Sequence, residues 1–443
     1  MKIAWCTPFS ERSAIGEFSA LVVAALRSLD VEVDIWYPRG VGGRTVPDAG
    51  RELGDASGPV LRTYDSVVYQ IGDHVKNHGQ ILALAAEAPG VVIMHDVSLV
   101  HLFFPTLIEL PRNELAALLR RLSPDRPDAA ADFARDPAVW AWSDDTAVGF
   151  PLSELAMRDA LTVVTHSAYA ARLFRDRYVG DVAVLPLPII HGPHTDRVAP
   201  LPLLDPDRPI VLQAGTLNAN KRVEDVITAF ERSRARATAQ LVICGHGSEK
   251  VIERIRDRAR HLVDEGSAVV LGAVADDVLD ALRRRALVSM VLRHPSTEAS
   301  SAVLVDSMAY GSAVIALRTG HYAEMPADTV RLTSFPADPD EIAEAIDSLV
   351  LEPDAARALG ARAEQYVRGA HTAQAYAQAL LPILAGSGSA VPRGWLVDEL
   401  AHAMVRTGLG ADDLVGPDVT RTITELFGGV PRRPEILGTA REG

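Results

Sequence analysis

The chain has 443 residues, 48% of them hydrophobic, and a formal net charge of −14. This length accommodates two domains, each with a full core. The acidic balance argues against a general nucleic-acid binder, which needs a basic surface, and against broad electrostatic attachment to anionic lipid. No apolar window is long enough to span a membrane and the first strand is too short for a signal peptide, so we expect no stable membrane insertion and a cytoplasmic location.

The N-terminal half alternates short apolar runs with amphipathic segments. This order predicts a parallel, doubly wound sheet, and we assign it to residues 1–190. Residues 105–153 depart from the alternation and are interpreted as a helical insertion over the ligand side, with a helix near 113–122. The two cysteines, Cys6 and Cys244, lie in apolar runs and are expected to be buried free thiols. The expected strands of this half are 2–8, 31–37, 66–72, 90–94, 160–165 and 182–185, and the expected helices are 18–29, 79–88 and a segment ending near Phe174.

The second half repeats the alternation after a linker rich in Pro, His and Asp at 186–209. We assign residues 209–385 to a second Rossmann-like domain, so the fold class is α/β, with two parallel-sheet domains facing an interdomain cleft. Residues 386–443 are expected to form a helical extension that packs on the N-terminal domain or at a homodimer interface. The expected strands are 210–214, 240–244, 268–271, 287–292 and 313–317, and the expected helices are 223–237, 249–265, 277–285, 302–309, 338–351 and 353–384.

Several polar residues follow the expected strands of the N-terminal half. Ligands of open parallel sheets bind beyond the carboxyl ends of the strands, so these residues are candidates for an acceptor site. A lone histidine is more often structural than catalytic, but His95 directly follows a strand of four apolar residues, and this position favours a functional role. Gly16 lies where such a fold brings backbone close to a ligand, and the structural alternative is an ordinary glycine at a helix start. The acceptor-side candidates are Gly72, Asp73, His95 and Asp96.

The stretch from His294 to Gly311 carries two carboxylates, Glu298 and Asp306, around a Ser-rich turn that leads into an apolar helix. Unpaired N–H groups at a helix start attract phosphate. Glu298 as a helix cap and Asp306 as a solvated helix residue are the structural alternative. Asp306 lies on a largely apolar helix, where an unpartnered charge is costly, and this favours a functional pair.

The order of five motifs resembles the C-terminal domain of glycosyltransferase family 4. The motifs are GTLNANKR (215–222), ICGHG (243–247), PSTEASSAVLVDSMAYG (295–311), VIA (314–316) and GHYAE (320–324). Members of that family have the GT-B fold and transfer sugars from nucleotide diphosphates with retention at the anomeric carbon. The resemblance covers roughly residues 1–385 and is closest over 210–325.

The resemblance implies a role for each matching residue. Glu298 and Asp306 match the acidic pair, the first expected near the donor sugar and the second, one methylene shorter than usual, at the ribose. Lys221 matches the diphosphate-binding lysine, whereas the usual arginine after the loop glycine is Thr216. The usual Gly-Phe-Gly is Ala299-Ser300-Ser301. The implied catalytic residues are Glu298, His95 and Lys221, and the implied donor-binding residues are Gly16, Gly215, Thr216, Lys221, Arg222, Gly245, Gly247, Val274, Glu298, Ser300, Ser301, Ala302 and Asp306.

These residues predict a metal-independent retaining glycosyltransferase with a soluble small-molecule acceptor, compatible with natural-product biosynthesis. A lysine and a helix N-terminus can stabilise the leaving diphosphate without a metal. Asp144-Asp145 and Asp276-Asp277 are interpreted as a solvated loop and a helix start, so we predict no metal site and no cofactor beyond the donor. The alternatives are a nucleotide-sugar 2-epimerase, a catalytically silent nucleotide-sugar-binding subunit and, less favoured because GxGxxG is missing, a nicotinamide-dependent oxidoreductase.

Overall fold

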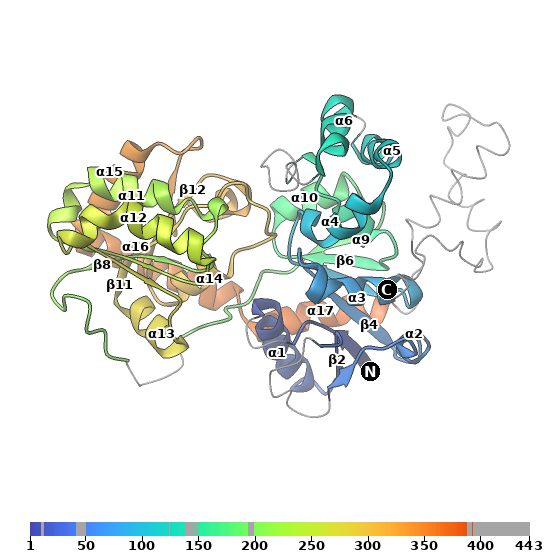
Figure 1. Ribbon diagram of the computed structural model, residues 1–443. Coiled ribbons are helices and arrows are strands. Elements are labelled where there is room, and N and C mark those ends of the chain that lie inside the picture. Colours follow the sequence, from blue (N-terminus) through green and yellow to red (C-terminus); the bar gives the residue numbers. More distant parts are fainter. Residues whose placement is uncertain are drawn as a thin grey trace.

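The structure is a computed structural model of the whole chain. It describes all residues except 10–12, 41–49, 124, 138–146, 148, 194–198, 388–391 and 393–443. Trp140, Trp142 and almost all of the expected extension at 386–443 therefore lie outside the described residues. Figure 1 shows two lobes, each a sheet with helices on both sides, joined by the linker and by the returning C-terminal helix.

The N-terminal domain contains a seven-stranded sheet in the order β3-β2-β1-β4-β5-β6-β7, and every neighbouring pair is parallel. All residues of β4 and β5 are buried, which explains why β5 is entirely apolar and why β4 is apolar apart from Ser66 and Gln70. The strands are β1 (Lys2–Cys6), β2 (Glu32–Tyr37), β3 (Arg51–Glu52), β4 (Ser66–Ile71), β5 (Val91–Met94), β6 (Thr162–Thr165) and β7 (Val182–Val184). The helices are α1 (Ala14–Arg27), α2 (Ser57–Leu61), α3 (Val75–Glu87), α4 (Val100–Glu109), α5 (Arg112–Leu122), α6 (Pro127–Arg135), α9 (Ser153–Met157) and α10 (Ala168–Arg175).

The second domain contains a six-stranded sheet in the order β10-β9-β8-β11-β12-β13, again parallel throughout. The predicted fold class, two doubly wound parallel-sheet domains, is confirmed. The strands are β8 (Ile210–Ala214), β9 (Gln240–Cys244), β10 (Ala268–Gly272), β11 (Ala286–Val291), β12 (Ala313–Leu317) and β13 (Arg331–Thr333). The helices are α11 (Val223–Arg232), α12 (Glu249–Asp264), α13 (Asp276–Arg285), α14 (Ala302–Ala309), α15 (Pro339–Val350), α16 (Pro353–Ala370) and α17 (Ala373–Ser387), with short 3₁₀ helices η1 (Ala219–Lys221), η2 (Arg234–Ala237) and η3 (Gly320–Glu324).

Helix α17 returns to the N-terminal domain. Its side chains Tyr376, Ala377, Leu380 and Leu384 are buried in the core that also contains β1 and α1. Figure 1 shows this helix beside α1, away from the second sheet. The chain therefore crosses back before residue 385, where we expected the second domain to end. The expected single helical segment 353–384 is in fact two helices, because the chain leaves helical geometry between α16 and α17.

The insertion is helical, as expected, and begins at α4. Its buried residues form a core of their own, centred on Leu115, Leu119, Phe133 and Phe150. The short elements β3, α2 and β13 were not predicted, because two- to five-residue segments carry too little periodicity. Helix α1 begins at Ala14 with Ser13 as its N-cap, so Gly16 lies in the first helical turn and not in a loop.

Candidate functional site

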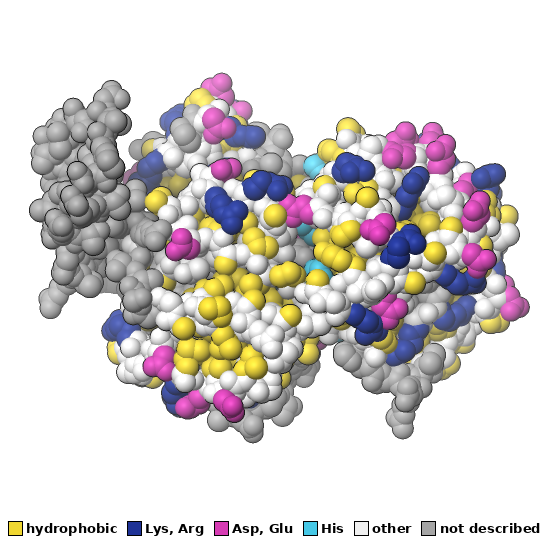
Figure 2. Space-filling view, turned by 180° about the vertical axis from the view of Figure 1, so that it is seen from behind, with side chains coloured by type: hydrophobic (Ala, Val, Ile, Leu, Met, Phe, Trp, Pro, Cys, Tyr) yellow, Lys and Arg dark blue, Asp and Glu magenta, His cyan; other side chains and the backbone are white. Residues whose placement is uncertain are grey.

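The carboxyl ends of the two sheets meet at residues 95–97 and 297–299. The N–H of Val97 donates to the carbonyl of Thr297 at 2.7 Å, and the N–H of Ala299 donates to the carbonyl of His95 at 2.8 Å. Asp96 and Glu298 form an isolated antiparallel bridge between these contacts. His side chains are visible at the junction of the two lobes in Figure 2. The strand ends predicted to hold the acceptor and the donor are therefore in direct contact.

Glu298 lies in a buried ionic cluster at this junction. Its carboxylate forms an ion pair with Arg293 and accepts a hydrogen bond from the Tyr322 hydroxyl at 2.7 Å. Burial opposes ionisation of Glu298, but the nearby charges of Arg293 and Lys221 outweigh it and lower the pKa to about 2. Glu298 is thus an ionised hydrogen-bond acceptor across the physiological range and not a proton donor.

Lys221 ends η1, and its side chain is only 7% exposed. Within the described part of the chain, its ammonium has no hydrogen-bond or ion-pair partner. Burial, followed by repulsion from Arg293, lowers the pKa of Lys221 to about 8. Two cations, Lys221 and Arg293, therefore lie near one fully ionised carboxylate, Glu298, and Arg293 also lies near Asp96, whose pKa is raised to about 7. A buried positive charge without a direct partner is costly, and an anionic ligand would remove that cost.

Four side chains around this cluster carry buried polar atoms that have no hydrogen-bond partner among the described residues. They are Asn220 Oδ1, Arg293 Nε, Ser296 Oγ and both ring nitrogens of His321. Burial lowers the pKa of His321 to about 4, so its imidazole is neutral. Buried polar groups are nearly always hydrogen-bonded, so this group of unpartnered atoms indicates a place for a polar ligand or ordered water.

Glycines fix the loop that presents Lys221. Gly215 (φ +114°) and Gly245 (φ +145°) have backbone conformations that favour glycine, and a Cβ on Gly245 would overlap the carbonyl of Gly215. The N–H of Leu217 donates to the carbonyl of His246 at 2.6 Å. The turns after β8 and β9 therefore pack backbone to backbone. A Cβ on Gly247 would lie 3.0 Å from the carbonyl oxygen of Leu217, so Gly247 belongs to the same contact.

The other residues expected to bind the donor differ in exposure and in hydrogen-bond partners. Thr216 is exposed, and the Arg222 guanidinium is committed to Asp225 at 2.6 Å. Ser301 is the N-cap of α14, and its hydroxyl accepts from the N–H of Leu304. Ser300, Ala302 and Val274 are half-buried, and Val274 packs on the core beneath β8 and β9.

Asp306 is 1% exposed, and its carboxylate is engaged by the linker. It accepts from the N–H groups of Ile190 and His191 and from the His191 ring. This arrangement differs from the expected carboxylate open to a ribose, and it could not be predicted because the partners of Asp306 are more than 100 residues away in the chain.

His95 is held from both sides. Its Nε2 lies 2.7 Å from the Gln70 side-chain oxygen, and its Nδ1 lies 3.2 Å from His166 Nε2, while His166 Nδ1 faces the carbonyl of Leu185 at 3.2 Å. Burial lowers the pKa of both histidines, His166 to about 4 and His95 well below its ordinary value. With both rings neutral, His166 donates to the Leu185 carbonyl and accepts from His95, so His95 Nε2 must accept from Gln70. This requires the Gln70 amide to be turned so that its NH₂ faces His95, and the Gln70 oxygen then takes the position of the nitrogen that has no partner.

The acceptor-side residues form one hydrogen-bonded group. The N–H of Asp73 donates to Asp96 at 2.9 Å, while the Asp73 carboxylate accepts from His101 at 2.6 Å and from the N–H of Leu102 at 2.8 Å. A Cβ on Gly72 would lie 2.8 Å from Ile15, so backbone approaches α1 closely here. Burial, then the charge of Asp73, raises the pKa of Asp96 to about 7. The hydrogen bond to Asp73 raises the pKa of His101.

Sequence reasoning missed several residues of this junction. Arg293 follows the buried strand β11, so the same strand-end rule that selected His95 would have found it. Tyr322 lies in the GHYAE motif, but the family resemblance implies no catalytic or binding role for it. His101 and His191 carry no local signal, because their partners are distant in sequence.

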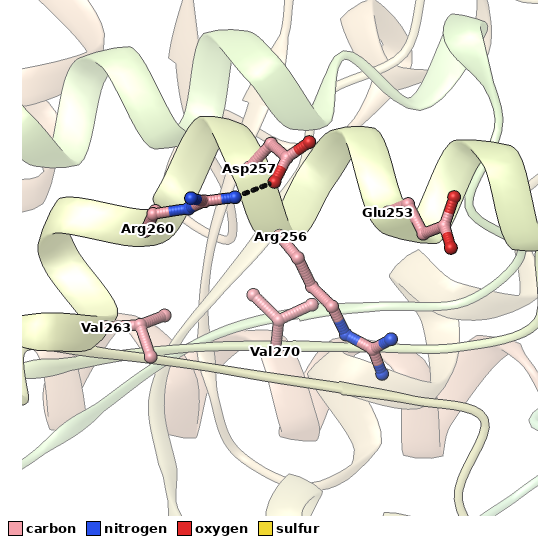
Figure 3. A pocket seen from close by; sticks show the side chains of 6 residues that line it. All are labelled: Glu253, Arg256, Asp257, Arg260, Val263 and Val270. Carbon is pink, nitrogen blue, oxygen red and sulfur yellow. Dashed lines mark hydrogen bonds and ion pairs between the residues drawn. The ribbon is translucent and has the colours of Figure 1, made fainter.

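Two surface depressions lie elsewhere. One, of about 590 Å³, lies between α12 and β10 and is lined by Glu253, Arg256, Asp257, Arg260, Val263 and Val270 (Figure 3). Arg260 and Asp257 pair with each other there, along the same face of the helix. The other is lined by charged residues around η2. Neither contains a residue of the junction.

No group of three or more His, Cys, Asp or Glu in the described residues is arranged to hold a metal ion. None of the helices described has the length and apolar character needed to cross a bilayer. Asp276 and Asp277 lie in the first turn of α13, as predicted, and Asp144-Asp145 lies outside the described residues.

Residues 200–366 match the family model of glycosyl transferases group 1. A search of curated protein sequences finds no match. Among solved structures, sucrose-phosphate synthase from Thermosynechococcus elongatus is 16% identical, with a TM-score of 0.60 over 86% of this chain and 98% of that chain. HepE from Anabaena, in complex with UDP and glucose, is 14% identical, with a TM-score of 0.56 over 87% of this chain and 100% of that chain.

A third neighbour is a UDP-forming α,α-trehalose-phosphate synthase from Burkholderia xenovorans. It is 12% identical, with a TM-score of 0.56 over 86% of this chain and 99% of that chain. At such identities the structural likeness shows the fold, which is GT-B. With the family match over the second domain, the prediction of a glycosyltransferase enzyme is confirmed.

Proposed function

We propose that this glycosyltransferase moves a sugar from a nucleoside-diphosphate sugar to a small-molecule acceptor, with retention and without a metal ion. The observation that carries the proposal is the excess positive charge at the junction, where Lys221 and Arg293 lie near the ionised Glu298 and Arg293 also lies near Asp96, whose raised pKa of about 7 leaves it only partly ionised. A diphosphate supplies the missing negative charge. The solved neighbour HepE holds UDP and glucose, which is consistent with such a donor.

Arg293 supplies the positive charge of the arginine that the family pattern has at the position of Thr216. Its guanidinium is buried at the end of β11, and its Nε has no partner in the described structure. Lys221 approaches from the turn after β8. When the bond to the sugar breaks, negative charge grows on the β-phosphate, and cations already in place stabilise it without reorganising. The protein's own cations thereby replace a metal.

Glu298 orients the donor sugar. Its carboxylate is ionised, and Tyr322 and Arg293 fix its direction. An ionised carboxylate accepts hydrogen bonds from sugar hydroxyls and favours positive charge at the anomeric carbon as the leaving group departs. Positioning of this kind lowers the barrier by holding the reacting atoms together.

Retention follows when the acceptor enters on the face that the diphosphate leaves. The bond from the anomeric carbon to the β-phosphate oxygen breaks, the acceptor oxygen bonds to the same carbon, and the acceptor proton passes to the phosphate oxygen. His95 cannot take this proton readily, because both its ring nitrogens are engaged and its pKa is low. We assign it an orienting role on the acceptor side.

The group Gly72, Asp73, Asp96 and His101 supplies the acceptor site. Asp96 has a pKa of about 7, so near neutral pH it can either accept a hydrogen bond from a hydroxyl of the acceptor substrate or donate one to it. The close approach of Gly72 to α1 keeps this site narrow, which favours a small acceptor. Val274 and its loop are assigned to selection of the donor base.

The proposal is tested with UDP-, dTDP- and GDP-sugars. Thermal shift detects binding, and release of the nucleoside diphosphate in the presence of an acceptor panel detects transfer. We expect stabilisation by one donor class and release with at least one acceptor. Stabilisation by no nucleotide sugar would overturn the proposal, and binding without release over a broad panel would favour a catalytically silent binding subunit.

A further inference from the structure

Both oxygens of the buried Asp306 carboxylate are engaged by groups of the protein. Its Oδ1 accepts from the N–H of Ile190 at 3.1 Å and from the N–H of His191 at 3.0 Å. Its Oδ2 accepts from His191 Nδ1 at 2.9 Å and lies 3.5 Å from the Arg283 guanidinium. Of the about four lone-pair positions that an ionised carboxylate offers, three therefore accept protein hydrogen bonds, and the Arg283 ion pair lies on the same side as the His191 ring bond. With 1% exposure, the side chain is closed to solvent as well.

His191 joins three parts of the molecule. Its other ring nitrogen, Nε2, lies 2.7 Å from the carboxylate of Glu17, which follows Gly16 in the first turn of α1. Both ring nitrogens therefore face carboxylates, which only accept hydrogen bonds, so the ring must carry two protons. The imidazolium connects α1 of the N-terminal domain, through the linker, to α14 of the second domain.

We propose that Asp306 is an interdomain anchor held by His191, and that this carboxylate does not read the ribose of the donor. The inference rests on the proposed function, since it concerns the nucleoside part of the same site. A carboxylate that binds a ribose through both hydroxyls rejects a 2′-deoxyribose, because one hydrogen bond is lost. With Asp306 withdrawn, the nucleoside site accepts ribose and 2′-deoxyribose with similar affinity.

The shorter side chain fits this role. A Glu at position 306 would extend one methylene further, and a residue 1% exposed among the linker and Arg283 has no room for it. The substitution of Asp for the Glu of the family pattern is then explained by the linker contact and not by a change of donor sugar.

The ligand test uses calorimetry with UDP and 2′-deoxy-UDP, and with GDP and 2′-deoxy-GDP. For the pair that binds, we expect wild-type Kd values within about threefold of each other, a ratio that Asp306→Asn leaves unchanged. A preference for ribose of about tenfold or more that Asp306→Asn abolishes would overturn the inference while leaving the proposed function standing. Binding of none of the four would count against the proposed function.

A second measurement tests the anchor without any ligand. Asp306→Asn, His191→Gln and the double variant are compared by thermal unfolding. We expect each single variant to lower Tm, and the double variant to lose no more than the worse single variant, because both remove the same contact. Additive losses would overturn the anchor.

The matched control is Asp347→Asn. Asp347 is a buried carboxylate of the same domain that accepts from Ser233, Ala235 and Arg234, none of which bonds to His191 or Asp306. We expect its loss of Tm to add to that of His191→Gln, since the two sites share no partner. If His191→Gln coupled to Asp347→Asn as strongly as to Asp306→Asn, the coupling would be a general effect of buried charge, and a specific His191–Asp306 contact would be contradicted.

Discussion

Asp96 at the end of β5 and Glu298 before α14 pair as an isolated antiparallel bridge across the two domains. The pairing brings a carboxyl group whose pKa is about 7 next to one whose pKa is about 2. At neutral pH Glu298 is therefore fully ionised and Asp96 only partly, although both side chains are largely withdrawn from solvent. Burial opposes ionisation of both groups; the charges of Arg293 and Lys221 outweigh it at Glu298, whereas the charge of Asp73 adds to it at Asp96.

Glu298→Gln is expected to lower kcat by about a hundredfold or more with the fold intact, because the amide keeps the shape but loses the charge that orients the sugar. Steady-state kinetics and thermal unfolding measure the two effects. Glu324→Gln is the control, since Glu324 pairs with Arg172 across the same domain boundary but nearer the surface. Turnover near wild type in Glu298→Gln, or an equal loss in both variants, would refute the assigned role.

Gly245→Ala is expected to destabilise the protein by several kcal/mol, about 3 or more, because the new Cβ overlaps the Gly215 carbonyl and φ is +145°. Denaturant unfolding gives the free energy. Gly369→Ala is the control, since it lies near the end of α16 with open space around it, and we expect no loss or a gain of up to about 1 kcal/mol. A neutral Gly245→Ala would show that the two turns are not packed as described.

Stability should fall as pH rises from about 6.5 to about 9, and His191 should account for part of the fall. The hydrogen bond to Asp306, followed by that to Glu17, raises the pKa of His191 to about 9. The folded state then binds more protons than the unfolded state in this window, so unfolding becomes easier as pH rises. In His191→Gln the contribution is absent, and the unfolding profile should be flatter between these pH values. An identical slope in both proteins would contradict the bridged imidazolium.

Activity should survive EDTA. Under the proposed mechanism, Lys221 and Arg293 neutralise the negative charge of the leaving diphosphate, so no divalent ion is required there. We expect initial rates with excess EDTA within about twofold of those without it. Loss of activity on chelation, restored by Mg²⁺ or Mn²⁺, would contradict a metal-free mechanism.

The fold could be predicted from the sequence to the level of individual strands. Strands β8, β9 and β12 have the predicted bounds, because their buried runs are sharply ended by Gly, Pro or polar residues. Helix α17 was assigned to the wrong domain, since an apolar helix surface records that it is buried but not against which core. Strand β13 was not predicted for a different reason, because three residues carry too little periodicity.

The candidate site was only partly predictable. The motif spacing selected Glu298 and Lys221, which the structure brings together with Arg293 at one junction. The motif spacing could not predict the contacts of His191 with Glu17 and Asp306, because these contacts depend on how the two domains dock. For Asp306, the pattern predicted an open ligand position, whereas the linker closes it.

Lys221 offers the most direct test of the central claim, that a diphosphate binds at this junction. The measurement is the Kd of the preferred nucleoside diphosphate for wild type, Lys221→Met, Lys221→Arg and Lys250→Met, taken from pH 6.5 to 9.5. Lys250 is an exposed lysine in α12 and serves as the control.

We expect Lys221→Met to weaken binding by about tenfold or more, which is about 1.4 kcal/mol, and Lys250→Met to change nothing. Since the pKa of Lys221 is about 8, wild-type affinity should fall as pH rises through that value, whereas Lys221→Arg, which stays charged, should bind without that fall. Equal affinities and equal pH profiles in wild type and Lys221→Met would contradict the claim.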